Sequence, residues 1–120
     1  MPNLNEKINY IELPAKNLDA VKSFFQAVFG FEFTDYGPEY TAFSCDSAGL
    51  EGGFYYSEAH SSVEKGAALI VFFSEQLEST LEKIQANGGQ VVKSIFEFPG
   101  GRRFHFSDPN GNEWAVWSTV

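Results

Sequence analysis

Apolar residues recur every three or four positions from Leu18 to Phe29, with polar residues between them. This interval places apolar side chains on one face of an α-helix. Asn17 precedes the segment and can cap the helix through its side-chain oxygen, and Gly30 follows as a C-terminal stop. The pattern therefore predicts a helix that begins after Asn17, ends before Gly30 and buries one face.

A later segment has the same spacing and predicts a second helix. Leu77, Leu81 and Ile84 form its apolar face. Ser74 is its expected N-cap, and Asn87-Gly88-Gly89 are expected to end it.

Short segments that are apolar, or that alternate between polar and apolar residues, predict strands. We expect the first strand to end at Pro14, and we expect tight turns at Gly37-Pro38, Asp46–Gly49 and Asp108–Gly111. Gly52-Gly53 indicates a bend or bulge. The predicted strands are residues 7–13, 31–36, 40–45, 52–57, 67–73, 90–96, 102–107 and 112–118.

The two halves of the chain repeat the same order of elements at an offset of 59 residues, around a polar linker at 58–66. The sequence therefore predicts an α+β fold of two βαβββ modules, residues 1–60 and 64–120. A module this short buries little core alone, so we expect both to pack into one domain spanning 1–120. Each helix is expected to cover one face of its sheet, and the other faces to line a concave cavity.

Composition narrows the possible partners. The chain is 43% hydrophobic and 17% aromatic, enough for a packed core. Its net charge of −8 argues against nucleic acids and anionic membranes and tolerates neutral or cationic ligands. Cys45 is the single cysteine, so no intrachain disulfide can form. No signal-like start and no long apolar run occurs, so we expect a cytoplasmic protein.

Four segments resemble the vicinal oxygen chelate superfamily, which includes glyoxalase I, bleomycin-resistance proteins and extradiol dioxygenases. The segments are residues 8–14, 17–19, 24–31 and 104–114. The resemblance is greatest to glyoxalase-related proteins of unassigned function. It implies paired βαβββ modules around an open, barrel-like cavity, commonly in a homodimer.

The resemblance also implies where metal ligands would stand. Metal enzymes of the superfamily use His or Glu on strands of both modules. Here the corresponding positions carry Tyr10, Leu69, Ala115 and, less firmly placed, Tyr56. Leucine and alanine offer no lone pairs to a divalent cation. We therefore expect no metal and no other cofactor.

Glu12 is the most informative polar residue. It lies two positions after Tyr10 on a predicted strand, so both should face the cavity, while Ile11 and Leu13 face the helix. Its carboxylate is predicted to fix a donor or cationic ligand, or to act as a catalytic base. The alternative is a solvated or ion-paired strand residue.

Other candidates for the cavity lie on strands late in each module. His105 is either a ligand contact or a half-exposed strand histidine. Glu113 and Trp117 should lie on the same face of their strand as Ala115, where Trp117 provides an apolar wall and Glu113 a charge. The alternative for Trp117 is packing in the core or at a dimer interface. The Arg102-Arg103 pair lacks the neighbours of an anion clamp and is expected to be a solvated strand end. The predicted ligand-binding residues are Tyr10, Glu12, Phe54, Tyr56, His105, Glu113 and Trp117.

These residues predict a protein that binds a small, partly apolar molecule without a metal, with drug sequestration as one version. One alternative is a metal-dependent lyase or isomerase of the glyoxalase type, or a dioxygenase, with Glu12, His105 or Glu113 as relocated ligands. A second alternative is a metal-free enzyme with Glu12 as base. The partners expected are a small molecule and a second copy of the chain.

Overall fold

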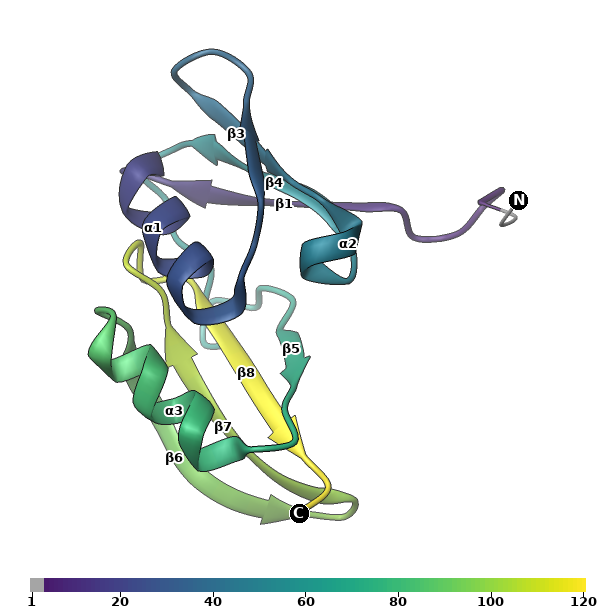
Figure 1. Ribbon diagram of the computed structural model, residues 1–120, viewed down its shortest axis with the longest axis vertical. Helices are drawn as coiled ribbons and strands as arrows, with labels where there is room; N and C mark the ends of the chain where they lie inside the picture. Colours follow the sequence, from purple (N-terminus) through teal and green to yellow (C-terminus); the bar gives the residue numbers. More distant parts are fainter. Residues whose placement is uncertain (1–3) are drawn as a thin grey trace.

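The computed structural model describes residues 4–120, which form two separate four-stranded sheets, each with one long helix (Figure 1). The first module contains β1 (Tyr10–Ala15), α1 (Leu18–Phe29), β2 (Phe33–Asp35), β3 (Tyr40–Phe43), the short helix α2 (Cys45–Ala48) and β4 (Glu51–Tyr56). The second contains β5 (Ile70–Phe73), α3 (Leu77–Ala86), β6 (Gln90–Phe98), β7 (Gly101–Ser107) and β8 (Glu113–Ser118). Residues 1–3, at the start of the first predicted module, lie outside the described residues.

The two sheets have the same strand order, β1-β4-β3-β2 and β5-β8-β7-β6. In each sheet the first and last strands of the module run parallel, and the other neighbours are antiparallel. This arrangement confirms the α+β fold and the repeated βαβββ order. The strands of residues 4–120 do not close into a barrel.

Several element boundaries differ from the sequence prediction. The first strand continues through Pro14 to Ala15, because β1 is an edge strand and proline is tolerated there. The turn predicted at Asp46–Gly49 is instead the short helix α2, which Ser44 caps. Ser74 is not the N-cap of α3: the cap is Gln76, and the Ser74 hydroxyl bonds to Thr80 Oγ1 at 2.7 Å.

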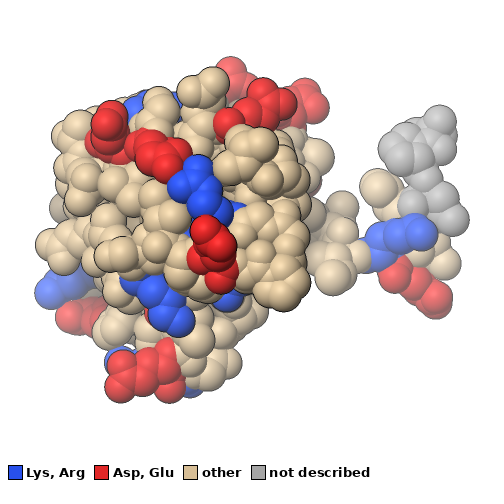
Figure 2. All heavy atoms as spheres, turned by 90° about the horizontal axis from the view of Figure 1, so that it is seen from below, with Lys and Arg blue, Asp and Glu red and all other residues tan. Residues whose placement is uncertain are grey.

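One face of the molecule shows how its charged side chains are arranged. On the face drawn in Figure 2, acidic and basic residues are interspersed, and neither sign forms a continuous region. Residues 4–9, before β1, extend away from the body of the molecule in Figures 1 and 2.

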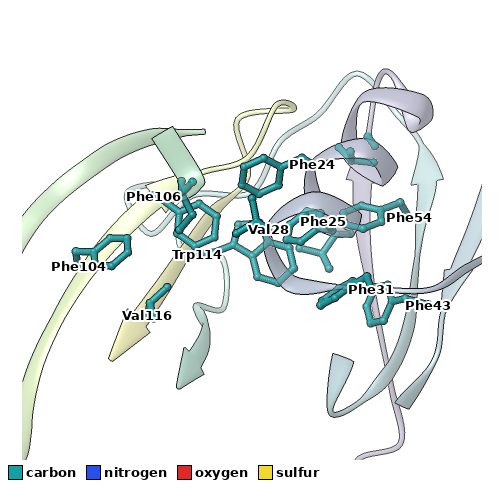
Figure 3. Close-up of a cluster of buried hydrophobic side chains, with 14 of the residues drawn as sticks. Phe24, Phe25, Val28, Phe31, Phe43, Phe54, Phe104, Phe106, Trp114 and Val116 are labelled. Atoms are coloured by element: carbon teal, nitrogen blue, oxygen red, sulfur yellow. The ribbon is translucent and has the colours of Figure 1, made fainter. Parts of the chain in front are cut away.

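One aromatic core joins the two modules (Figure 3). Phe25 on α1 is fully buried, and its ring centroid lies 5.5 Å from that of Phe54 in the first sheet and 4.9 Å from Trp114 in the second. Both sheets therefore turn their helix-covered faces toward a shared centre. Their uncovered faces, which we call the open faces, point away from each other.

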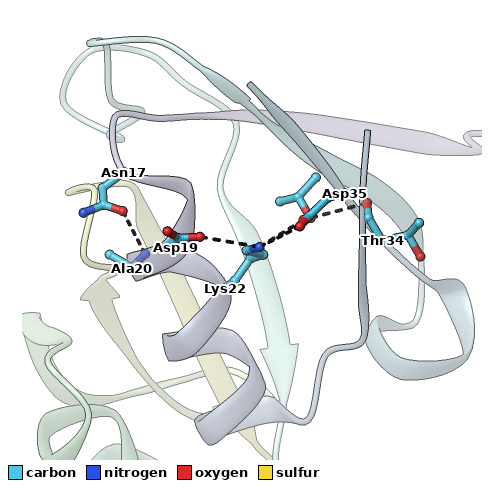
Figure 4. Close-up of polar contacts among 7 residues, drawn as sticks. Asn17, Asp19, Ala20, Lys22, Thr34 and Asp35 are labelled. Atoms are coloured by element: carbon cyan, nitrogen blue, oxygen red, sulfur yellow. Dashed lines mark hydrogen bonds and ion pairs between the residues drawn. The ribbon is translucent and has the colours of Figure 1, made fainter. Parts of the chain in front are cut away.

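Local contacts fix α1 against its own sheet (Figure 4). Asn17 Oδ1 accepts a hydrogen bond from Ala20 N at 3.1 Å, which confirms the predicted cap. Lys22 Nζ lies 3.6 Å from Asp19 and 3.0 Å from Asp35 on β2. Lys22 thereby connects the first turn of α1 to the sheet edge.

The turn that precedes β8 connects the second module to the first. Asn112 is fully buried: its Nδ2 donates to Pro14 O at 2.8 Å, and its Oδ1 accepts from Ser61 N at 2.9 Å. Asp108 accepts from Trp114 Nε1 at 2.9 Å and from the backbone of the turn. Burial raises the pKa of Asp108, while these hydrogen bonds oppose the shift. The turn therefore connects the modules through polar contacts as well as through the core.

Candidate functional site

The open face of the first sheet carries a polar cluster built from three side chains. Glu12 on β1 lies opposite Gly53 on β4, which in turn lies opposite Ala42 on β3. The two small residues leave room across the middle of the sheet. The side chain of Tyr40, two positions before Ala42, reaches over this gap toward Glu12.

Two hydrogen bonds connect the side chains of Tyr10, Tyr40 and Glu12. Tyr40 Oη donates to Glu12 Oε2 at 2.9 Å and lies 2.6 Å from Tyr10 Oη. Because the Tyr40 proton points to the carboxylate, the Tyr10 hydroxyl donates to Tyr40. Burial raises the pKa of Tyr40, and its bonds to Tyr10 and Glu12 raise it further, so Tyr40 remains a donor at neutral pH.

Gly53 explains why this cluster can form. A Cβ added at Gly53 would overlap the Tyr40 ring, with Cζ at 2.6 Å, and the Thr41 carbonyl oxygen at 2.8 Å. The sequence did not predict Tyr40, and the bend or bulge predicted at Gly52-Gly53 is wrong, because both glycines pair in regular register within β4. A glycine inside a strand also signals the close approach of another group, which was the available clue.

A groove of about 570 Å³ lies beside this cluster, between β1 and the linker that leads to β5. Glu12, Pro14 and Tyr55 line one side, and His60 and Lys65 of the linker are among the residues that line the rest. Glu12 is exposed, and its Oε1 has no hydrogen bond to any part of the chain that the structure describes. The groove thus offers a free carboxylate oxygen beside an apolar wall.

The open face of the second sheet holds a histidine–carboxylate pair. His105 on β7 is 3% exposed, and its Nδ1 lies 2.8 Å from Glu113 Oε2 on β8. Burial raises the pKa of Glu113, but hydrogen bonds from His105 and from Val63 N, with the charge of Lys93, outweigh it and leave the pKa below its ordinary value. The ionised carboxylate therefore keeps the proton of His105 on Nδ1.

Two predicted cavity residues lie on the other side of the first sheet. Phe54 is opposite Leu13 and fully buried in the core, so the prediction that it faces the cavity is wrong. Tyr56 shares its side and lies among Lys16, Asn17 and other residues at the start of α1. The reason is that Leu13 and Phe54 both pack toward α1, which leaves Tyr55 on the open face.

The remaining candidates divide between the two sheets. Tyr10 and Glu12 lie together on the first open face. His105, Glu113 and Trp117 lie on the second, where alternation along the strand had placed Glu113 and Trp117 together. The alternative of a half-exposed strand histidine is wrong, because His105 is buried. In a single chain these groups do not share one cavity, because the two open faces point away from each other.

The residues at the family's metal positions do not fit an ion. Leu69 and Ala115 have no donor atoms, and the Tyr10 hydroxyl bonds to Tyr40. Within residues 4–120, no three side chains of His, Cys, Asp or Glu come together in a way that could hold a metal. The relocated set of Glu12, His105 and Glu113 is divided between the two sheets.

Comparison with known proteins gives a family and a set of similar folds. The family model described as Glyoxalase/Bleomycin resistance protein/Dioxygenase superfamily matches residues 7–116. A search of curated proteins found no match. In the part of the chain that the structure describes, no helix is long and apolar enough to span a membrane.

Three solved structures illustrate the similarity of fold. A glyoxalase-related enzyme from Fulvimarina pelagi has 17% identity and a TM-score of 0.77, covering 94% of this chain and 88% of its own. The fosfomycin resistance protein FosX from Listeria monocytogenes has 21% identity and a TM-score of 0.76, with coverage of 96% and 94%. Lactoylglutathione lyase from Agrobacterium tumefaciens has 20% identity and a TM-score of 0.69, with coverage of 94% and 93%.

Proposed function

This chain belongs to the glyoxalase/bleomycin resistance protein/dioxygenase superfamily, and on that premise we propose that it binds a small, partly apolar molecule without a metal. The bound molecule lies in the groove beside β1. The observation that carries the proposal is the exposed Glu12 carboxylate, which Tyr40 orients through a 2.9 Å hydrogen bond.

The chemistry of the groove selects the ligand. A cationic or N–H group pairs with the free oxygen of Glu12, since charge-assisted hydrogen bonds are the strongest available to it. Pro14 and Tyr55 contact the apolar part of the ligand. The net charge of −8 of the whole chain also favours a cation over an anion as ligand.

We also propose that the protein is a cytoplasmic homodimer. The open faces carry exposed apolar side chains that a second copy would cover, among them Tyr10 (42% exposed) and Phe73 (53% exposed). The unpaired Cys45 agrees with a reducing compartment. Sedimentation at micromolar concentration tests the dimer, and a purely monomeric boundary contradicts it.

The ligand proposal is tested by native mass spectrometry and thermal shift with a panel of cationic aromatic compounds. We expect at least one compound to stabilise the protein, and Glu12→Gln to abolish that shift. Glu39→Gln removes the same charge from an exposed side chain and should leave the shift unchanged. The proposal is contradicted if no compound stabilises the wild type, or if Glu12→Gln and Glu39→Gln change the thermal shift equally.

Metal analysis of the purified protein distinguishes this proposal from the metal-dependent alternative. Elemental analysis after addition of nickel, zinc or manganese should find no stoichiometric ion. Stoichiometric binding that Glu12→Ala abolishes would replace our proposal with a metal-dependent lyase or isomerase.

A further inference from the structure

The groove beside Glu12 also contains a positive charge, on the wall that the linker forms. Lys65 belongs to the linker that leads to β5, and it lines the same groove as Glu12. Within residues 4–120 Lys65 forms no ion pair, although the chain has 16 acidic residues and only 8 basic ones. Glu12 and Lys65 are therefore opposite charges that line one groove and do not neutralise each other.

A hydrogen-bonded turn of residues 62–67, which we call the linker turn, holds Lys65 at the groove. Lys65 N and Ala67 N both donate to Ser62 O, at 3.2 and 3.0 Å, and Gly66 N donates to Val63 O at 3.0 Å. Gly66 has a φ of 85°, a left-handed conformation that glycine adopts without strain. The backbone on both sides of Lys65 is thus fixed by the turn.

The second module anchors the linker turn. Ser61 N donates to Asn112 Oδ1 at 2.9 Å, and Glu113 N donates to Ser61 O at 2.8 Å. Glu113 Oε1 accepts a further hydrogen bond from Val63 N at 3.0 Å. On the other side of the groove, Asn112 Nδ2 donates to Pro14 O of β1 at 2.8 Å. The two charged walls are therefore joined before a ligand binds, which lowers the entropic cost of binding.

The remaining lining of the groove suits a small organic molecule. Its volume of about 570 Å³ lies within the range of about 300–1,000 Å³ that is typical of small-molecule sites. Tyr55 provides an aromatic surface, and Ala67 and Ala68 occupy little space on the linker side. Ser62 lines the groove next to Lys65, and its Oγ accepts a hydrogen bond from Lys65 N at 3.3 Å. The hydroxyl proton of Ser62 is therefore available for a second acceptor.

We propose that the groove binds a zwitterion, an amino-acid-like molecule with an ammonium group, a carboxylate and an apolar side chain. Glu12 binds the ammonium group, Lys65 and the Ser62 hydroxyl bind the carboxylate, and Tyr55 contacts the apolar part. A molecule with both charges pairs with both walls, whereas a simple cation leaves Lys65 without a counter-charge and a simple anion leaves Glu12 without one. This inference rests on the proposed function and narrows it, because it adds a carboxylate to the cationic, partly apolar ligand.

Three probes with the same phenyl group test the proposal. Phenylalanine carries both charges, phenethylamine carries only the ammonium group, and 3-phenylpropionate carries only the carboxylate. Affinities are measured at pH 7 by NMR titration of the isotope-labelled protein, in which the amide resonances of Lys65 and Gly66 report binding at the linker turn. Lys65→Gln is compared with Lys83→Gln, which removes the same charge from an exposed side chain in the last turn of α3. Thermal unfolding checks that both variants are folded.

We expect phenylalanine to bind the wild type at least about 10-fold more tightly than phenethylamine, because its carboxylate adds a charged hydrogen bond. The affinity for 3-phenylpropionate should be the lowest of the three, because Glu12 repels its carboxylate. Lys65→Gln should remove the advantage of phenylalanine and should not weaken the binding of phenethylamine. Lys83→Gln should leave all three affinities within about twofold of the wild type, as expected for a residue far from the ligand.

The zwitterion proposal is overturned if phenylalanine and phenethylamine bind the wild type equally, or if Lys65→Gln and Lys83→Gln have the same effect on phenylalanine. In both cases the binding of phenethylamine would still support a cation site at Glu12, so the proposed function would stand alone. If none of the three probes binds and no other cationic aromatic compound stabilises the protein, the proposed function and the zwitterion proposal fail together.

Discussion

Replacement of Asn112 by alanine tests whether the turn before β8 holds the two modules together. In the wild type this side chain donates to Pro14 O at 2.8 Å and accepts from Ser61 N at 2.9 Å. In the variant, Pro14 O keeps the hydrogen bond from Asn110 Nδ2 at 3.0 Å, which partly compensates for the lost bond from Asn112. Ser61 N loses its acceptor, and the polar group that remains is only partly accessible to water.

The magnitude follows from these contacts. A backbone N–H left without a partner costs about 1–3 kcal/mol. The small cavity left by the removed amide adds about 1 kcal/mol. We therefore expect Asn112→Ala to lower the free energy of unfolding by about 2–4 kcal/mol, a large part of the 5–15 kcal/mol typical of a domain.

Equilibrium unfolding in urea, followed by tryptophan fluorescence, measures this change. Asn87→Ala is the control, because Asn87 is exposed and its side chain donates to Lys83 O within its own helix end. It should change the stability by less than about 0.5 kcal/mol. Asn112→Asp should be more damaging than alanine at pH 7, because it places a carboxylate against Asp108 and the Pro14 carbonyl.

A loss below about 1 kcal/mol for Asn112→Ala would refute the reasoning, since it would mean that water satisfies Ser61 N in the variant. Wild-type stability of Asn112→Asp at pH 7 would refute it as well. Two separate unfolding transitions in the wild type would contradict the shared core from which the argument starts.

Three further predictions concern the core and the two open faces. Phe25→Ala should cost about 3–5 kcal/mol in urea unfolding, because it leaves a cavity between the modules. Gly53→Ala should cost about 1–3 kcal/mol and displace Tyr40 from its carboxylate partner, which thermal shift and tyrosine titration detect. Glu113→Gln should cost about 1.5–3 kcal/mol near pH 6, where the ionised carboxylate bonds to His105. Because the folded-state pKa of Glu113 lies below its ordinary value of 4.5, this difference between wild type and variant should shrink as the pH falls through that lowered pKa.

The site was predictable only in part. Alternation along β1 placed Tyr10 and Glu12 on the same face, and alternation along β8 placed Glu113 with Trp117, as the structure has them. The role of Tyr40 was not predicted, because its side chain crosses a glycine diagonally to reach Glu12, and such a contact produces no periodic pattern in the sequence. The partners of a strand residue are set by the register between strands, which periodicity does not contain.

The sequence by itself determined the local structure and the repeated order of elements. Helical spacing, the cap at Asn17 and the stop at Gly30 act within a few residues, so their effect does not depend on the rest of the chain. Polarity along β1 predicted correctly that Ile11 and Leu13 face α1, but only the tertiary structure decided the buried side of β4, where residues 54–56 are all aromatic. Period-two alternation separates the two faces of such a strand but does not say which one is buried. That choice depends on distant contacts such as Phe25 with Trp114, which turn both covered faces inward and leave Glu12 and His105 on opposite open faces.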